Sequence, residues 1–181
     1  MRAFSILIQL SVAITFAGTF RIEAENVMKD TVVGPVKIEL HVMPAEPFFT
    51  ADQIKTKKVD SGMLIMGGAA PVAPDADPRS NHHLVVHVFK AKTGKAITDA
   101  KVRMTFQPVD DNGNLSGGPA DVPIVVMQAI GKGKESTHYG NNVEMPAGSY
   151  VVEVSVNEKK AHFRIAVKNV VTEIMKEMQM H

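Results

Sequence analysis

The chain has 181 residues, with 20 Lys and Arg against 19 Asp and Glu, and a formal net charge of +1. This balance excludes the basic surplus that binding to nucleic acid or to an anionic membrane surface requires. The chain contains no Cys, so we expect no disulfide and no cysteine-linked lipid anchor, but it has 11 Met and 7 His.

The N-terminus has the pattern of a secretory signal peptide. A short basic start, Met1-Arg2, precedes a largely apolar run over residues 3–17, and Ile22-Glu23-Ala24 offers a small residue at a cleavage point. The run is short for a membrane span, so a retained anchor is the less favoured alternative. We therefore expect residues 1–24 to be removed. The mature protein would be soluble and periplasmic, with no membrane insertion and with basic and acidic side chains in equal number.

The first predicted strand covers residues 36–43, where apolar and polar side chains alternate with a period of two. The side chains expected to face the core are Val36, Ile38, Leu40 and Val42. Those expected to face outward are Lys37, Glu39, His41 and Met43. After a turn at Pro44, the polar residues 50–60 favour a loop, residues 63–66 form a short apolar run, and residues 67–81 favour a long irregular loop.

Further strands are predicted over residues 83–90, 101–107, 122–127, 142–145, 150–156 and 161–167. Turn signals separate these segments at intervals of roughly 8–12 residues, which is typical of a β-sandwich. We therefore expect an all-β sandwich of seven to eight strands with long loops over residues 25–170. Residues 171–181 form a tail rich in Met and His, which either docks on the domain as a helical turn or transfers metal between molecules.

Thioether and imidazole are ligands that suit copper, and imidazole also suits iron and zinc. Glu39, His41 and Met43 follow one another at every second position of a predicted strand, so they share a face at spacings of about 6.6 Å. This spacing lets neighbouring side chains converge on one ion. The alternative is that Met43 is only a covered surface residue at a strand end.

Three His within six residues, His82, His83 and His87, form a second candidate group. His83 and His87 share one strand face, but their Cα atoms lie about 13 Å apart, so a regular strand brings only one of them to a given site. His82 would point to the opposite face.

The remaining Met residues divide between ligand and core roles. Met66 stands beside Gly67-Gly68 and is a better ligand candidate than Met63, which has apolar neighbours. Met104 and Met127 alternate with apolar residues and are assigned to the core, because filling core gaps is the commonest role of Met.

No catalytic set accompanies these groups. The sequence contains no Cys nucleophile, no Gly-x-Ser-x-Gly and no phosphate-binding loop. We therefore expect a binding protein and not an enzyme.

Three segments together resemble a known family: residues 37–47, Met66-Gly67-Gly68-Ala69-Ala70 followed by His83-Leu84, and His138-Tyr139-Gly140-Asn141-Asn142-Val143 with Gly148-x-Tyr150. They are similar to the periplasmic iron-transport metal-binding proteins over most of residues 32–168. The resemblance implies an immunoglobulin-like β-sandwich, often a homodimer, that binds copper and a second metal. It also implies a partner, an inner-membrane iron permease.

Carried onto this sequence, the resemblance implies that Met66, His83 and His138 are metal ligands, with a further ligand from the first strand near Glu39 or His41. We expect His41 or His87 to complete the site. The expected ion is copper, with iron or another divalent transition metal as the alternative. The strand His82-His83-Leu84-Val85-Val86-His87 departs from the family pattern, and the Met and His of the tail have no family counterpart.

Three functions are consistent with this sequence. The first is a metal-binding component of iron uptake that works with a membrane permease. The second is a periplasmic copper carrier or copper-resistance protein. The third is a sandwich module for adhesion or assembly that binds no metal and in which the His and Met are incidental.

Overall fold

The computed structural model describes residues 27–73 and 81–168. The expected signal peptide, residues 1–24, and the expected Met- and His-rich tail, residues 171–181, lie outside these ranges and stay predictions. Within the described ranges, no helix is long and apolar enough to cross a membrane.

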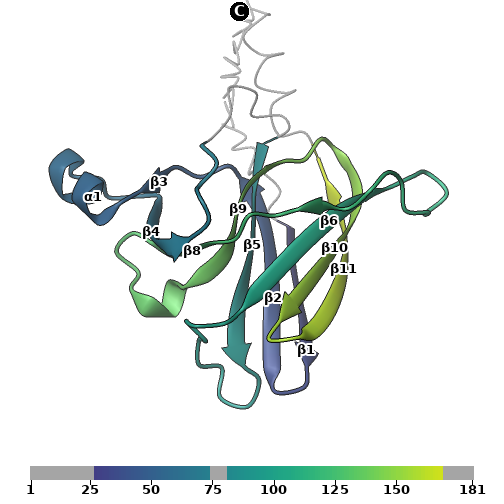
Figure 1. The fold of residues 1–181 in the computed structure, drawn as a ribbon, viewed down its shortest axis with the longest axis horizontal. Helices are drawn as coiled ribbons and strands as arrows, with labels where there is room; N and C mark the ends of the chain where they lie inside the picture. Colours follow the sequence, from purple (N-terminus) through teal and green to yellow (C-terminus); the bar gives the residue numbers. More distant parts are fainter. Residues whose placement is uncertain (1–26, 74–80, 169–181) are drawn as a thin grey trace, which may run out of the picture.

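The described chain forms two β-sheets that enclose a common core (Figure 1). The seven-stranded sheet has the order β1 (Val27–Val33), β2 (Val36–Pro44), β5 (Asn81–Lys90), β9 (His138–Glu144), β8 (Val125–Ala129), β4 (Met63–Gly68) and β3 (Phe48–Phe49). The four-stranded sheet has the order β11 (Lys159–Val167), β10 (Gly148–Val156), β6 (Val102–Val109) and β7 (Ala120–Asp121). Neighbouring strands are antiparallel, except that β3 and β4 are parallel. The predicted all-β sandwich is confirmed, but the described chain has eleven strands and not the expected seven to eight.

The main core consists of the alternate side chains that the strand patterns predict. All four side chains expected to point inward from β2 are buried, and Met104 of β6 is 2% exposed. The same alternation buries every second residue from Tyr150 to Val156 on β10 and from Ala161 to Val167 on β11. The Tyr139 hydroxyl donates a hydrogen bond to the Ile97 carbonyl (2.9 Å) and accepts one from the Ala100 amide (3.1 Å), which attaches the segment between β5 and β6 to the core.

Helix α1 (Ala51–Lys57) and strand β1 are among the elements that were not predicted from the sequence. The segment expected to be a loop contains helix α1, which begins with a capping box: Thr50 accepts from the Gln53 amide, and the Gln53 side chain accepts from the Thr50 amide. This Thr-x-x-Gln spacing is a helix-start signal that can be read in the sequence. Strand β1 is an edge strand with mostly exposed or half-buried residues, so it lacks the apolar alternation that marks β2.

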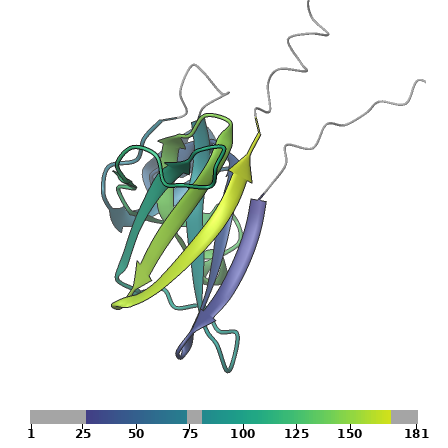
Figure 2. The ribbon, with the colours of Figure 1, turned by 90° about the vertical axis from the view of Figure 1, so that its right-hand side faces the viewer.

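A second, smaller cluster of buried side chains lies on the outer face of the seven-stranded sheet. It contains Met63, Val85, Val125 and Met127, with Met43 and Phe48 packed against it. The rings of Phe48 and His83 lie 5.7 Å apart, although β3 and β5 are separated by three strands in the sheet order. The sheet therefore curls, so that β3 and β4 cover the outer face of β5 (Figure 1). Figure 2 shows β1 at the edge of the molecule, beside β11 of the other sheet.

Candidate metal centre

The candidate site lies on the outer face of the seven-stranded sheet, next to the second cluster. Residues that face each other across neighbouring strands have side chains on the same side of the sheet. The registers give three rows on this face: first Met43, His83 and Asn142; then Met28, His41, Val85, Gly140 and Val125; then Asp30, Glu39, His87, His138 and Met127. In the third row, His138 follows His87 because it lies one residue beyond the pair Val86 and Tyr139.

Gly140 stands in the middle of this arrangement. A Cβ atom at Gly140 would collide with the Leu84 carbonyl oxygen and with Val85 on β5. Only glycine therefore lets β9 approach β5 this closely. Because Gly140 has no side chain, nothing on β9 separates His138 from Asn142 on the outer face, and the fully buried Val85 lies under the cluster.

Four imidazoles form a continuous row on this face. The ring centroids of His41 and His87 are 4.8 Å apart, those of His87 and His138 are 5.0 Å apart, and those of His138 and His83 are 5.7 Å apart. Burial increases along the row, from the half-buried His41 and His87 to His138 (3% exposed) and the fully buried His83. His138 of β9 contacts His83 and His87 of β5, so these two join one cluster despite their distance along the strand.

Three of the rings are held through hydrogen bonds to acceptors that surround the cluster. His83 Nδ1 donates to the Asn142 side-chain oxygen (3.0 Å), and His138 Nδ1 donates to the Ser136 carbonyl oxygen (2.7 Å). These oxygens only accept, so the contacts assign the proton to Nδ1 in both rings and leave Nε2 as a lone pair. The His87 ring is hydrogen-bonded to the backbone of Thr137.

The Nε2 atoms of His41, His83 and His138 are buried and have no hydrogen-bond partner among the described residues. Buried polar atoms are nearly always paired, so three unpaired imidazole nitrogens on one sheet face need an explanation. A metal-binding imidazole has one nitrogen held by a carbonyl or carboxylate and the other directed at the ion. His83 and His138 have this arrangement, and the side chains present therefore fit a transition metal.

The cluster is electrically neutral at physiological pH. Burial, with a smaller contribution from the neighbouring imidazoles, lowers the pKa values of His83, His87 and His138 to about 4. Burial also lowers the pKa of His41, against the opposing effect of the Glu39 carboxylate, which lies 3.9 Å from His41 Nε2. Neutral imidazoles keep their lone pairs, so no proton has to be displaced from them when a cation binds near pH 7.

Two thioethers adjoin the imidazole row. Met43 is the register partner of His83, and the fully buried Met127 is the register partner of His138. The apolar alternation around Met127 correctly predicts burial. Its pairing with His138 depends on the register of β8 and β9, which that alternation does not reveal.

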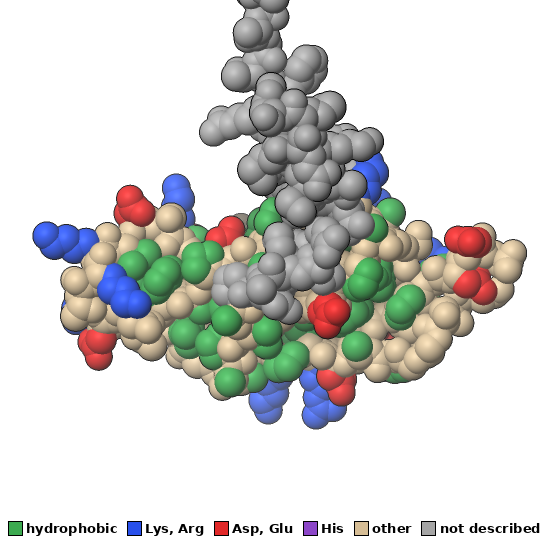
Figure 3. Space-filling view, turned by 90° about the horizontal axis from the view of Figure 1, so that it is seen from above, with side chains coloured by type: hydrophobic (Ala, Val, Ile, Leu, Met, Phe, Trp, Pro, Cys, Tyr) green, Lys and Arg blue, Asp and Glu red, His purple; other side chains and the backbone are tan. Residues whose placement is uncertain are grey.

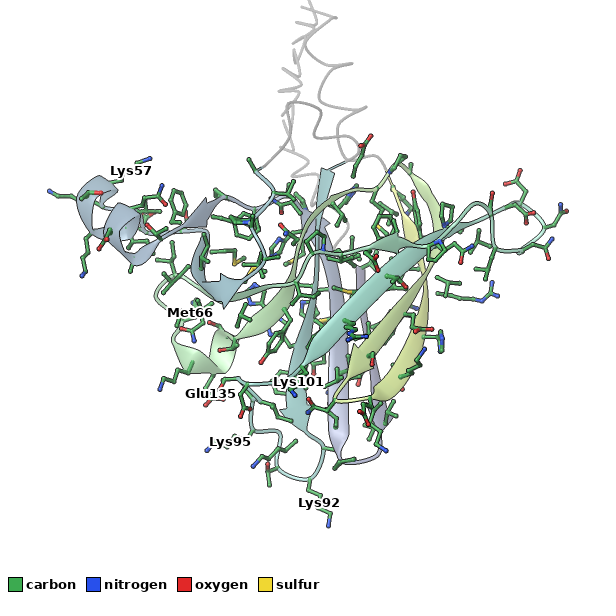
Figure 4. The ribbon with its side chains drawn as sticks, in the orientation of Figure 1. Lys57, Met66, Lys92, Lys95, Lys101 and Glu135 are labelled. Carbon is green, nitrogen blue, oxygen red and sulfur yellow. The ribbon has the colours of Figure 1, made fainter. Side chains whose placement is uncertain are left out.

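Met66 lies apart from the row. It is 53% exposed, and β4 and β8 change register next to it. It lines a small pocket with Val126 and Gln128, which flank Met127 on β8, and with Thr137, which precedes His138. Figure 4 shows Met66 beside β8, above the turn that carries Glu135. The structure thus brings together five of the six predicted ligands, namely Glu39, His41, His83, His87 and His138.

Two buried amides attach the surrounding loops to the site. The Asn142 side-chain oxygen also accepts from the Glu46 amide (3.1 Å), and its nitrogen donates to the carbonyls of Glu46 (2.9 Å) and Val72 (2.8 Å). The Asn141 oxygen accepts from the amides of Val72 (2.8 Å) and Asn142 (2.9 Å), and its nitrogen donates to the carbonyls of Ala70 and Pro123. Asn142 therefore joins His83 to two loops, whereas no hydrogen bond joins Asn141 to a described histidine.

The imidazoles form a row and not a ring. Among the described residues, no three His, Asp or Glu side chains are arranged to hold one ion together. Figure 3 shows one face of the molecule, on which hydrophobic side chains lie among backbone and polar atoms, most charged side chains lie toward the rim, and no histidine is in view. A groove of about 920 Å³, with Lys29, Asp110 and Arg164 in its lining, shares no residue with the cluster.

Comparisons with known proteins bear on the fold. A scan against protein-family models and a search of curated proteins gave no match to this sequence. A search of solved structures matched a crystal structure of the copper-reconstituted P19 protein from Campylobacter jejuni, with a TM-score of 0.50 and 9% sequence identity. The match covers 80% of this chain and 96% of P19. At this identity the likeness shows the sandwich fold that the family resemblance implies.

Proposed function

We propose that this protein binds a transition metal at the imidazole row, and that the metal is copper. The observation that carries the proposal is the set of three buried, unpartnered Nε2 atoms. If the histidines only filled space, each unpaired nitrogen would destabilise the fold by about 1–3 kcal/mol. A bound ion would remove that cost, because it takes the lone pairs as ligands.

The side chains around the row favour copper over harder metals. Imidazole and thioether together suit copper, and thioether favours Cu(I) in particular. His83 and His138 would hold the ion at the buried end, where Met43 and Met127 supply the adjacent thioethers. Since no three imidazoles of the described residues converge, an ion would take neighbouring imidazoles together with a thioether.

The physiological role that we propose is metal binding in the periplasm as part of iron uptake, beside an inner-membrane permease. Support comes from the His138-Tyr139-Gly140-Asn141-Asn142 segment and from the fold likeness to a protein crystallised in a copper-reconstituted form. The buried thioethers favour a second role, that of a copper carrier. A strain that lacks the gene distinguishes the two roles: slow growth at limiting iron supports the first, and sensitivity to added copper supports the second.

The direct test is elemental analysis and copper titration of the untagged mature protein. We expect stoichiometric copper in the wild-type protein and its loss in the double variant His83→Ala/His138→Ala. His162→Ala is the matched control, because His162 is exposed on the other sheet and pairs with Glu153 (2.9 Å). A wild-type protein that neither contains copper nor takes it up would refute the proposal.

A further inference from the structure

Met28 stands at the exposed end of the imidazole row. It is the register partner of His41 on the neighbouring strand β2. Paired side chains on one sheet face have Cβ atoms about 4.5–5.5 Å apart. Met28 is 67% exposed, whereas His41 is half-buried and its Nε2 atom has no hydrogen-bond partner in the part of the chain that the structure describes. A solvent-exposed thioether therefore lies directly beside the first imidazole of the row.

The row opens toward solvent on the β1 side. Exposure falls from Met28 through His41, whose side chain is 21% exposed, to the buried His138 and His83. On the opposite side the rows end at Val125 and Met127, which are fully buried against side chains of β4. An ion from solvent thus meets the β1 edge before it meets the buried rings.

The carboxylates at this edge are already engaged. The Lys37 ammonium group lies 3.4 Å from the Asp30 carboxylate and 2.7 Å from the Glu39 carboxylate. Both hard carboxylate ligands next to His41 are therefore already engaged in ion pairs with one ammonium group. The thioether of Met28 carries no charge, binds no proton and has three rotatable bonds, so it can bend toward a neighbouring ring.

We propose that a soft metal ion reaches the buried imidazoles from the β1 edge, with the Met28 thioether as its first ligand and His41 as the next. This inference rests on the proposed function and adds a route and a selectivity to it. Thioether favours Cu(I) over hard divalent cations, so an edge with this ligand selects the soft ion before it reaches the imidazoles, which bind many metals.

The experiment follows Cu(I) transfer to the full mature protein from a coloured chelator complex by stopped flow. We expect Met28→Leu to slow uptake about tenfold, which corresponds to about 1.4 kcal/mol in the barrier, while the final copper content stays stoichiometric. Met28→His, which restores a ligand at the same place, should recover most of the rate.

Two controls isolate the position of the thioether. Met66→Leu removes another exposed Met and should leave the rate unchanged. Met28→Leu/Val32→Met moves a thioether along the same face of β1 to the partner of Lys37, and it should stay slow.

A second measurement follows the methionine methyl groups by NMR during titration with Ag(I), a redox-inert substitute for Cu(I). Once the buried imidazoles are filled, further Ag(I) should shift the Met28 methyl signal together with the ring signals of His41. Wild-type uptake rates in Met28→Leu, with copper still lost in His83→Ala/His138→Ala, would overturn the route and leave the proposed function standing. A wild-type protein that takes up no copper would overturn both.

Discussion

Replacement of Asn142 by Leu tests whether the hydrogen bond to His83 prepares the metal centre. The Asn142 amide has two functions in the structure, because it holds the proton of His83 on Nδ1 and attaches two loops through Glu46 and Val72. Leu has a similar volume but makes none of these hydrogen bonds. We therefore expect two separable effects, one on stability and one on copper affinity.

The loop contacts set the size of the stability effect. Asn142 makes four side-chain hydrogen bonds, three of them to partly buried backbone groups. At about 1 kcal/mol for each bond, Asn142→Leu should lower the free energy of unfolding by on the order of 3–4 kcal/mol. For the metal, loss of a partner that orients a ligating histidine typically weakens affinity by about 10–100-fold.

Asn141→Leu is the matched control. Asn141 is also fully buried and also makes four side-chain hydrogen bonds, but none reaches a described histidine. Urea denaturation should therefore show similar losses of stability in the two variants. Competition with a Cu(I) chelator should show the larger loss of affinity in Asn142→Leu. Equal affinities in the two variants would refute the assignment of His83 as a ligand oriented by Asn142.

Three further predictions follow from the same geometry. The metal-free protein should lose stability as the pH falls from about 6.5 toward 4, because the buried imidazoles take up protons near pH 6.5 in the unfolded state but near pH 4 in the folded state. Each imidazole should lower the free energy of unfolding by on the order of 3 kcal/mol. Urea midpoints that do not change between pH 7 and pH 5 would contradict this. Gly140→Ala should force β9 away from β5, lower the free energy of unfolding by about 3 kcal/mol or more and weaken copper binding. Gly113→Ala lies in an open turn with nothing within 4 Å of the added Cβ, so it should leave copper binding unchanged in the same titration. Met127→Leu keeps the apolar volume but removes a thioether beside the row, so it should weaken Cu(I) binding in the chelator assay more than Met66→Leu does. A larger loss of affinity in Met66→Leu would point to Met66 as the thioether ligand.

The strand patterns predict much of the sheet face correctly. The alternation in residues 36–43 places Glu39, His41 and Met43 on the outward side, and the structure confirms that side for all three. The sandwich class also follows from these patterns, because period-two alternation and frequent turns are local properties of the sequence. The Thr50 capping box is equally local, and it predicts α1 better than the polar composition of that segment predicts a loop.

The composition of the metal centre depends on contacts that are not local. His83 and His87 lie too far apart along β5 to contact each other directly, yet His138 from a strand about fifty residues later contacts both. The pairing of Met127 with His138 depends on the same register. At Met66 a register irregularity interrupts the alternation of faces, which a regular pattern cannot anticipate. Strand order and register are long-range properties, and they decide which of the predicted ligands meet.

The side chains that stabilise the sandwich and the imidazoles proposed to bind metal lie on opposite faces of the seven-stranded sheet. The main core lies between the sheets and contains none of the four imidazoles of the row, while those imidazoles lie on the other side of the seven-stranded sheet. Substitutions on the outer face can therefore change the ligand set while the sandwich persists. A lineage that starts from this scaffold could shift its metal preference in small steps, with each intermediate still folded.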